Sequence, residues 1–274
     1  MLIDIDRHLI NCHIVGEGKP VFLLHGLGCD HRLMMGCMEP VFARYSAYRR
    51  IYIDLPGMGA SDASLDLCSS DRILALLNRL AERLAGSEPF LLAGESYGGY
   101  LAQGMLATCP PGQVDGLLLI CPVVIAAHAE RDVPPHKILA EDGAFLSKLP
   151  PEERTRFEEY AVIADQDTYA RYKNELLPGI LAADRPFLEG LAKQYTFSFD
   201  LRQKIDTLCY DRPVLLIAGR QDGCVGYRDL WRTVENYPRA TYAVLDFAGH
   251  NLQIEQPALF NSLVENWLER LDRC

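Results

Sequence analysis

The sequence predicts an α/β protein, with a mostly parallel central sheet flanked by helices and with one helical segment inserted. Short apolar runs recur along the chain, and glycine or proline closes each of them. Stretches with helical periodicity lie between these runs, as in chains that alternate strand and helix. A long middle stretch breaks this rhythm. The length of 274 residues suits one such domain that carries an insertion.

The strands are predicted first, because their hydrophobicity is continuous rather than alternating. Continuous apolar runs are typical of parallel strands that are buried on both faces. The first twenty residues alternate and predict short strands before these, with a turn at residues 16–18. The buried strands are expected at Pro20–Leu24, Arg50–Leu55, Pro89–Ala93, Val114–Ile120, Pro213–Ala218 and Thr241–Asp246.

Helices are predicted in the intervals between the strands. Ser70–Ala85 has leucines and an isoleucine along one broad stripe, an acidic Asp71 in its first turn and Gly86 after its end. Tyr97–Cys109 is a second helix, stopped by two prolines. Two further helices are expected at Asp229–Asn236 and Ala258–Leu271.

The middle stretch, residues 123–199, contains no convincing buried strand. Two proline pairs punctuate it, and helical runs are expected at Pro151–Ala164 and Tyr169–Leu177. We therefore predict a core domain made of residues 1–122 and 200–274, with residues 123–199 as a helical insertion over one end of the sheet. The insertion is rich in Phe and Tyr, which favours an apolar pocket, although the same rings could simply pack it onto the sheet.

The net charge indicates which partners to expect, and the cysteine content indicates the cellular compartment. The formal net charge of −10 repels phosphate backbones and anionic lipid, so neither nucleic acid nor membrane is an expected partner. Charged residues interrupt the N-terminus, and no apolar run approaches the roughly 18 residues that span a bilayer. The nine cysteines form no C-x-x-C pair or zinc-like cluster, which favours reduced thiols in a cytoplasmic protein. The sequence predicts no particular oligomeric state.

The chemistry centres on Gly94-Glu95-Ser96-Tyr97-Gly98, which matches G-x-S-x-G. The motif follows an apolar strand and precedes a helix, where a sharp turn would expose the serine hydroxyl. Side chains at Gly94 and Gly98 would collide across that turn. Ser96 is therefore the predicted nucleophile, and a serine hydroxyl needs a base.

Among the seven histidines, His250 is the predicted base. It directly follows the last predicted strand, and the loops after parallel strands all emerge at one edge of the sheet. His250 and Ser96 should share that edge. His25 shares it as well, but its place in a His25-Gly26 turn favours a loop-fixing role.

An acid is needed to fix the tautomer of the base, and Asp222 is the preferred candidate. It follows the strand expected at Pro213–Ala218 and so lies at the same edge. Asp246 is a rival, but it sits at the end of a strand and close to His250 in sequence. Asp54 precedes a Pro-Gly turn, which favours a structural role.

Taken together, these motifs resemble the α/β-hydrolase superfamily, in particular its capped esterase, lipase and C–C-bond hydrolase members. The resemblance runs nearly end to end, and the residue order serine, aspartate, histidine is the one found in that fold. Glu95 stands where the family often has histidine. The matching segments are H-G-L-G from His25, D-L-P-G-M-G-A-S-D from Asp54, G-E-S-Y-G-G from Gly94, G-R-Q-D from Gly219 and G-H-N-L-Q-I-E-Q-P from Gly249.

The resemblance implies further roles. The backbone N–H groups of Leu27 and Tyr97 would form the oxyanion hole, Glu255 and Pro257 would be scaffold residues, and the insertion would be the cap. A serine hydrolase of a small to medium, largely uncharged ester, thioester or activated ketone is expected, with no cofactor and no metal. Lyases and perhydrolases keep the same triad and stay open, as does a small-molecule receptor or an interaction module on this shell.

Overall fold

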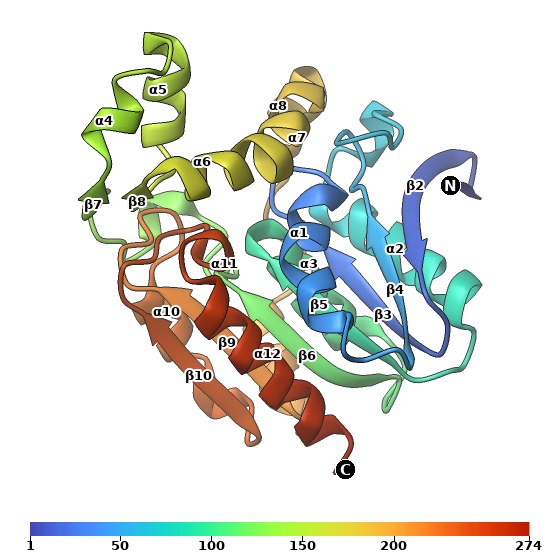
Figure 1. Ribbon diagram of the computed structural model, residues 1–274. Coiled ribbons are helices and arrows are strands. Elements are labelled where there is room, and N and C mark those ends of the chain that lie inside the picture. The colour runs from blue at the N-terminus through green and yellow to red at the C-terminus, as the bar shows by residue number, and fades with distance from the viewer. Residues whose placement is uncertain (274) are drawn as a thin grey trace.

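A mixed sheet of eight strands organises the molecule (Figure 1). The structure is a computed structural model and describes residues 1–273. Its strands are β1 (Leu2–Ile5), β2 (His8–Val15), β3 (Lys19–Leu24), β4 (Tyr48–Ile53), β5 (Phe90–Glu95), β6 (Val114–Ile120), β9 (Val214–Gly219) and β10 (Ala240–Leu245).

The strand order is β1-β2-β4-β3-β5-β6-β9-β10. β2 pairs antiparallel with both β1 and β4, while every other neighbouring pair in this sheet is parallel. The predicted mostly parallel sheet is thus confirmed, and the carboxyl ends of β3, β5, β6, β9 and β10 meet at one edge.

Helices cover both faces of the sheet, with α1 packed against α12 on one side and α2, α3 and α9 packed together on the other (Figure 1). α10 and the 3₁₀ turns η1 and η4 lie in loops that connect the strands. The elements are α1 (His31–Phe42), η1 (Leu65–Leu67), α2 (Ser70–Ala85), α3 (Ser96–Thr108), α9 (Leu201–Leu208), α10 (Tyr227–Trp231), η4 (Val234–Asn236), α11 (Leu252–Glu255) and α12 (Pro257–Leu271).

α2 shows why these boundaries fall where they do. The Ser69 hydroxyl accepts the N–H of Arg72 and caps the first turn, and Gly86 ends the helix at a φ of +59°. Ile73, Leu77 and Leu80 are fully or almost fully buried on the stripe that faces the core. The predicted range Ser70–Ala85 is confirmed.

Residues 123–199 carry short helices and a small two-stranded parallel sheet, β7–β8. These elements lie beyond the edge of the main sheet where the parallel strands end (Figure 1). They are η2 (His128–Glu130), β7 (Ala140–Glu141), α4 (Gly143–Leu146), α5 (Pro151–Glu158), β8 (Ile163–Ala164), α6 (Gln166–Arg171), the π-helical turn η3 (Tyr172–Leu176), α7 (Leu177–Ala182) and α8 (Arg185–Ala192).

Three helix predictions were too long. The helix expected over Pro151–Ala164 ends at Glu158, because Ile163 and Ala164 pair with the distant β7. The helix expected over Tyr169–Leu177 is divided by η3, and the imide of Pro178 lacks the N–H that a regular ladder needs. The helix expected over Asp229–Asn236 gives way to 3₁₀ geometry, where the N–H of Thr233 bonds to Leu230 O.

The aromatic rings of residues 123–199 are used largely for packing. The rings of Phe145, Phe157, Tyr169 and Tyr172 contact one another in tilted and edge-to-face pairs and form a separate small core. Phe187, Phe197 and their neighbours pack against the main core instead. Within residues 1–273, none of the helices combines the length and the apolar character needed to cross a bilayer.

Candidate active site

Ser96 sits at the point where β5 turns into α3. Its φ is +52°, a left-handed conformation that is uncommon for a residue with a side chain. The turn closes only because its flanks are glycines. A Cβ on Gly94 would lie 2.4 Å from Gly98 O, and one on Gly98 would lie 2.3 Å from Leu24 O. The clash of Gly94 lies across the turn, as predicted, whereas Gly98 is required by the end of the neighbouring strand β3.

The three predicted side chains converge at the carboxyl edge of the sheet. Nε2 of His250 lies 2.9 Å from Ser96 Oγ, and Nδ1 lies 2.9 Å from Asp222 Oδ2. Their loops follow β5, β9 and β10, so the parallel pairing of the sheet brings together residues that are far apart in the sequence. One imidazole thus bridges a hydroxyl and a carboxylate.

Asp222 is held as an anion inside the protein. Only 1% of its side chain is exposed, and its Oδ1 accepts the N–H groups of Cys224 and Val225. Burial alone would raise the pKa of this carboxyl, but His250 and these backbone donors bring it below its ordinary value. The carboxylate is therefore available to orient the imidazole.

The pKa of His250 is shifted in the opposite direction, upward. Burial alone would lower the pKa of the imidazole, yet the attraction of Asp222 raises it well above the ordinary value of 6.5. The imidazole is thus a strong base, well suited to take a proton from Ser96. Its loop is anchored by Glu255, whose Oε2 accepts the N–H of Gly249 at 2.6 Å.

His25 fixes the neighbouring loop instead of taking part in the hydrogen-bonded chain. Its Nε2 accepts the N–H of Leu55 at 3.0 Å, which places the ring proton on Nδ1, where it faces Gly26 O at 2.8 Å. Burial lowers the pKa of this imidazole, so the ring is neutral. Gly26 lies directly against Ser96: a Cβ there would be 3.2 Å from Ser96 Cβ. Leu27 comes next in the chain.

The two rival aspartates have other partners. Asp54 is fully buried and accepts the N–H groups of His31 and Ala60 and the side-chain amide of Asn11. Asp246 is exposed and accepts from the side chain of Gln221. The structure brings neither of them to His250 Nδ1.

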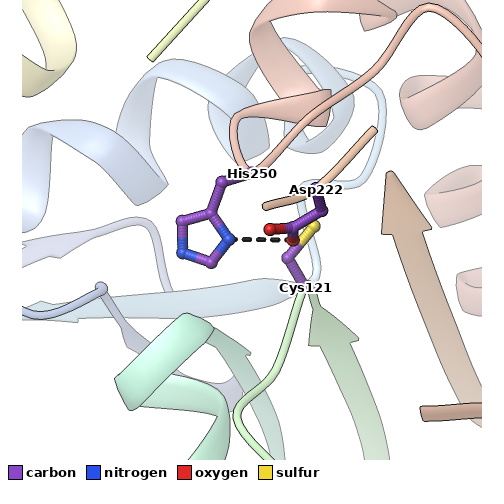
Figure 2. A group of neighbouring side chains, drawn as sticks. All are labelled: Cys121, Asp222 and His250. Carbon is purple, nitrogen blue, oxygen red and sulfur yellow. Dashed lines mark hydrogen bonds and ion pairs between the residues drawn. The ribbon is translucent and has the colours of Figure 1, made fainter. Parts of the chain in front are cut away.

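Cys121 is a neighbour of this site that the sequence reasoning missed. Figure 2 shows its sulfur beside the Asp222 carboxylate, and ligand atoms of Cys121, Asp222 and His250 lie within 4.8 Å of one another. Burial raises the pKa of this thiol strongly, whereas a metal requires the thiolate. Nδ1 of His250 is already bonded to Asp222, so the set does not suit a metal ion. Cys121 directly follows the parallel strand β6. It could have been found from the sequence, because residues that follow parallel strands lie at the same edge of the sheet.

A cavity of about 180 Å³ lies elsewhere, between α3, α9 and α10. Its walls include Gln103, Ile125, Ile205 and Arg232, and none of Ser96, Asp222 and His250. A cavity alone is weaker support for a reacting site than three side chains in hydrogen-bonded sequence, so the site is assigned to the latter.

Comparison with known proteins agrees with this geometry. The model of the alpha/beta hydrolase family matches residues 21–263. The chain belongs to this family. The crystal structure of an alpha/beta superfamily hydrolase from Oenococcus oeni superposes with a TM-score of 0.87 at 31% identity, over 96% of each chain.

Curated relatives of this α/β hydrolase are named as esterases and as a hydrolase. The pimeloyl-(acyl-carrier protein) methyl ester esterase of Shewanella oneidensis is 28% identical over 81% of each chain. The (E)-2-((N-methylformamido)methylene)succinate hydrolase of Acinetobacter baylyi is 24% identical over 93% of this chain and 92% of its own length. The α/β hydrolase described here is thus a carboxylesterase-like enzyme.

Proposed function

We propose that this α/β hydrolase is a serine esterase that cleaves small to medium, largely uncharged esters through an acyl-enzyme. The observation that carries the proposal is the unbroken chain from Ser96 Oγ through His250 to Asp222, with both contacts at 2.9 Å. Nucleophile, base and orienting acid in this order are the requirement for acyl transfer to serine.

In the first half-reaction, His250 Nε2 takes the proton of Ser96 as Oγ attacks the carbonyl carbon. The imidazolium that forms donates its Nδ1–H to Asp222 and is stabilised by it, and the Asp222 carboxylate stays ionised. The tetrahedral intermediate collapses when Nε2–H gives its proton to the leaving alkoxide. An alcohol departs, and the acyl group remains on Ser96.

The negative oxygen of the intermediate needs donors that are already in place. We assign this role to the backbone N–H groups of Leu27 and Tyr97. Tyr97 follows Ser96 in the chain, and Leu27 follows Gly26, which packs against the Ser96 side chain. Each donor of this kind typically contributes about 3–4 kcal/mol to stabilising the transition state.

The second half-reaction repeats these steps with water. His250 takes a proton from water, which attacks the acyl carbonyl, and the imidazolium then returns a proton to Ser96 Oγ. The carboxylic acid leaves and the resting site is restored. Apart from water and the two backbone donors, these steps use only the side chains of Ser96, His250 and Asp222.

The substrate class follows from the relatives and the proposed cap. Relatives named as methyl ester esterases favour a carboxylic ester with a small alcohol over a thioester or activated ketone. We propose that residues 123–199 form the cap over the core made of residues 1–122 and 200–274. The aromatic side chains of this segment favour largely uncharged acyl groups of small to medium size.

The decisive experiment uses a fluorophosphonate probe together with methyl and p-nitrophenyl esters of increasing acyl length. Wild-type protein should be labelled at one site and should turn over the short esters. Ser96→Ala should do neither, while its thermal unfolding stays close to that of wild type. Folded wild-type protein that resists the probe would instead favour a small-molecule receptor on the same fold.

A further inference from the structure

Glu95, the residue before Ser96, places a second carboxyl group inside the active site. Only 2% of Glu95 is exposed. Its side chain does not cap α3, although it stands at the start of that helix. It lies instead along the His25-Gly26 turn, where a Cβ on Gly26 would come within 2.1 Å of Glu95 Oε2. Gly26 thus leaves the space that the carboxyl group occupies.

The carboxyl group touches the catalytic imidazole. Glu95 Oε1 lies 3.4 Å from Nε2 of His250, the nitrogen that also faces Ser96 Oγ. Asp222 binds the opposite nitrogen, so the ring lies between two acidic side chains. Glu95 Oε2 is buried and has no hydrogen-bond partner among residues 1–273. The backbone of Gly26 also lies beside this carboxyl group and, like His250, favours its charged form.

Several titratable groups face Glu95 from the surrounding loops and helices. His250 and Asp222 approach from the loops after β10 and β9, Cys29 from the loop after β3, and Cys37 from α1. Burial raises the pKa of both thiols, so they stay neutral. Burial also raises the pKa of Glu95 to about 7, against the attraction of His250.

We propose that Glu95 is a positioning residue that holds the Nε2–H of the His250 imidazolium and thereby sets the pH at which the base becomes active. The proposal rests on the proposed function, because it concerns the same base. While Glu95 and His250 share one proton, part of the population carries it on Nε2, where it blocks removal of the Ser96 proton. When that proton leaves to solvent, His250 is free to act, and Glu95 then stabilises the imidazolium that forms during attack.

The test is the pH dependence of inactivation by the fluorophosphonate probe, which reports on Ser96 without knowledge of the substrate. Glu95→Gln keeps the shape of the side chain and removes its charge. The acid limb of the profile should move to lower pH by about one to three units, since a charge at this distance shifts a pKa by that amount. The limiting rate at high pH should fall, because a weaker base takes the proton less readily.

Asp246→Asn is the matched control. It removes the same charge from an exposed side chain four residues before His250, and its profile should superimpose on that of wild type. Glu95→Asp, which withdraws the carboxyl group by one methylene, should shift the limb in the same direction as Glu95→Gln by a smaller amount. It also covers the case in which Glu95→Gln does not fold.

The outcomes separate the two proposals. If wild-type protein is labelled and the profile of the folded Glu95 variant coincides with it, the positioning role is wrong while the serine esterase stands. An equal shift in Asp246→Asn also overturns the role, because the effect is then one of general charge. If wild-type protein is not labelled at any pH, the proposed function itself fails.

Discussion

The carboxylate of Glu255 holds the backbone of Val162: its Oε1 accepts the Val162 N–H at 2.6 Å. Its other oxygen accepts the N–H of Gly249, at the same distance, directly before His250. One buried side chain therefore joins the loop of the proposed base to residues 123–199. The position of the His250 loop relative to residues 123–199 therefore depends on this carboxylate.

Glu255→Gln should weaken both stability and esterase activity. A glutamine has one acceptor oxygen, so either Gly249 or Val162 would meet an NH₂ group, and a buried donor would lose its partner. The expected cost is about 1–3 kcal/mol of unfolding free energy, measured by denaturant titration, together with a clear loss of kcat. Glu265→Gln, whose charged group pairs with an exposed Arg44, should change either quantity little.

Asp222→Asn should leave the fold intact and abolish most of the turnover. The amide oxygen can still accept from Cys224 and Val225, but the side chain no longer holds His250 in the tautomer that accepts the Ser96 proton. A loss of about 10⁴-fold in kcat is expected by comparison with the same change in other serine triads. Asp246→Asn serves again as the control, and an equal loss there would identify the wrong acid.

Gly26→Ala should destabilise the protein through a clash with Glu95. The new methyl group would lie 2.1 Å from Glu95 Oε2 and 3.2 Å from Ser96 Cβ. Overpacking of this kind costs about 1–3 kcal/mol. Combining it with Glu95→Ala should recover part of the loss, so unfolding free energies of the two single variants and the double variant should be clearly non-additive. Additive losses would contradict a direct contact.

Glu95 should also make stability depend on pH. Its folded-state pKa, about 7, lies above its ordinary value of 4.5. The folded state therefore binds the proton more tightly, and the resulting stabilisation is complete below pH 4.5 and lost as the pH rises through 7. Relative to wild type, Glu95→Gln should gain on the order of 1–3 kcal/mol between acidic and alkaline buffer. Thermal unfolding of both proteins across this range measures it, and parallel curves would contradict the raised pKa.

The central strands could be predicted from the sequence because each is buried on both faces. Val114–Ile120 was located without error, and the others within one or two residues. The strand expected at Thr241–Asp246 is present as β10, but the prediction that it is buried was wrong, because β10 lies at the edge of the sheet and is only partly buried. α1 was missed because Gly36 and Pro40 interrupt its pattern. Gly36 is required because a Cβ there would lie 2.2 Å from the side chain of Glu175, which is far away in the sequence. The local hydrophobic periodicity cannot indicate such a long-range contact.

The sequence predicted which loops form the site, but it did not predict every side-chain contact within it. Ser96, Asp222 and His250 each follow a parallel strand, and topology alone brings such loops to one edge. The contact between Glu95 and His250 depends on the direction of one side chain and on the space left by Gly26. Those are properties of packing, which motifs do not encode.

β6 and β9 are adjacent parallel strands, and residues 123–199 lie in the connection between them. A connection of this kind leaves the sheet and returns to it beside the strand from which it departed. Whatever its size, it imposes no change on strand order. Residues 123–199 could therefore be replaced by a segment of another size while the strands that precede Ser96, Asp222 and His250 keep their pairing, provided that the new segment offers Glu255 a backbone donor in the place of Val162.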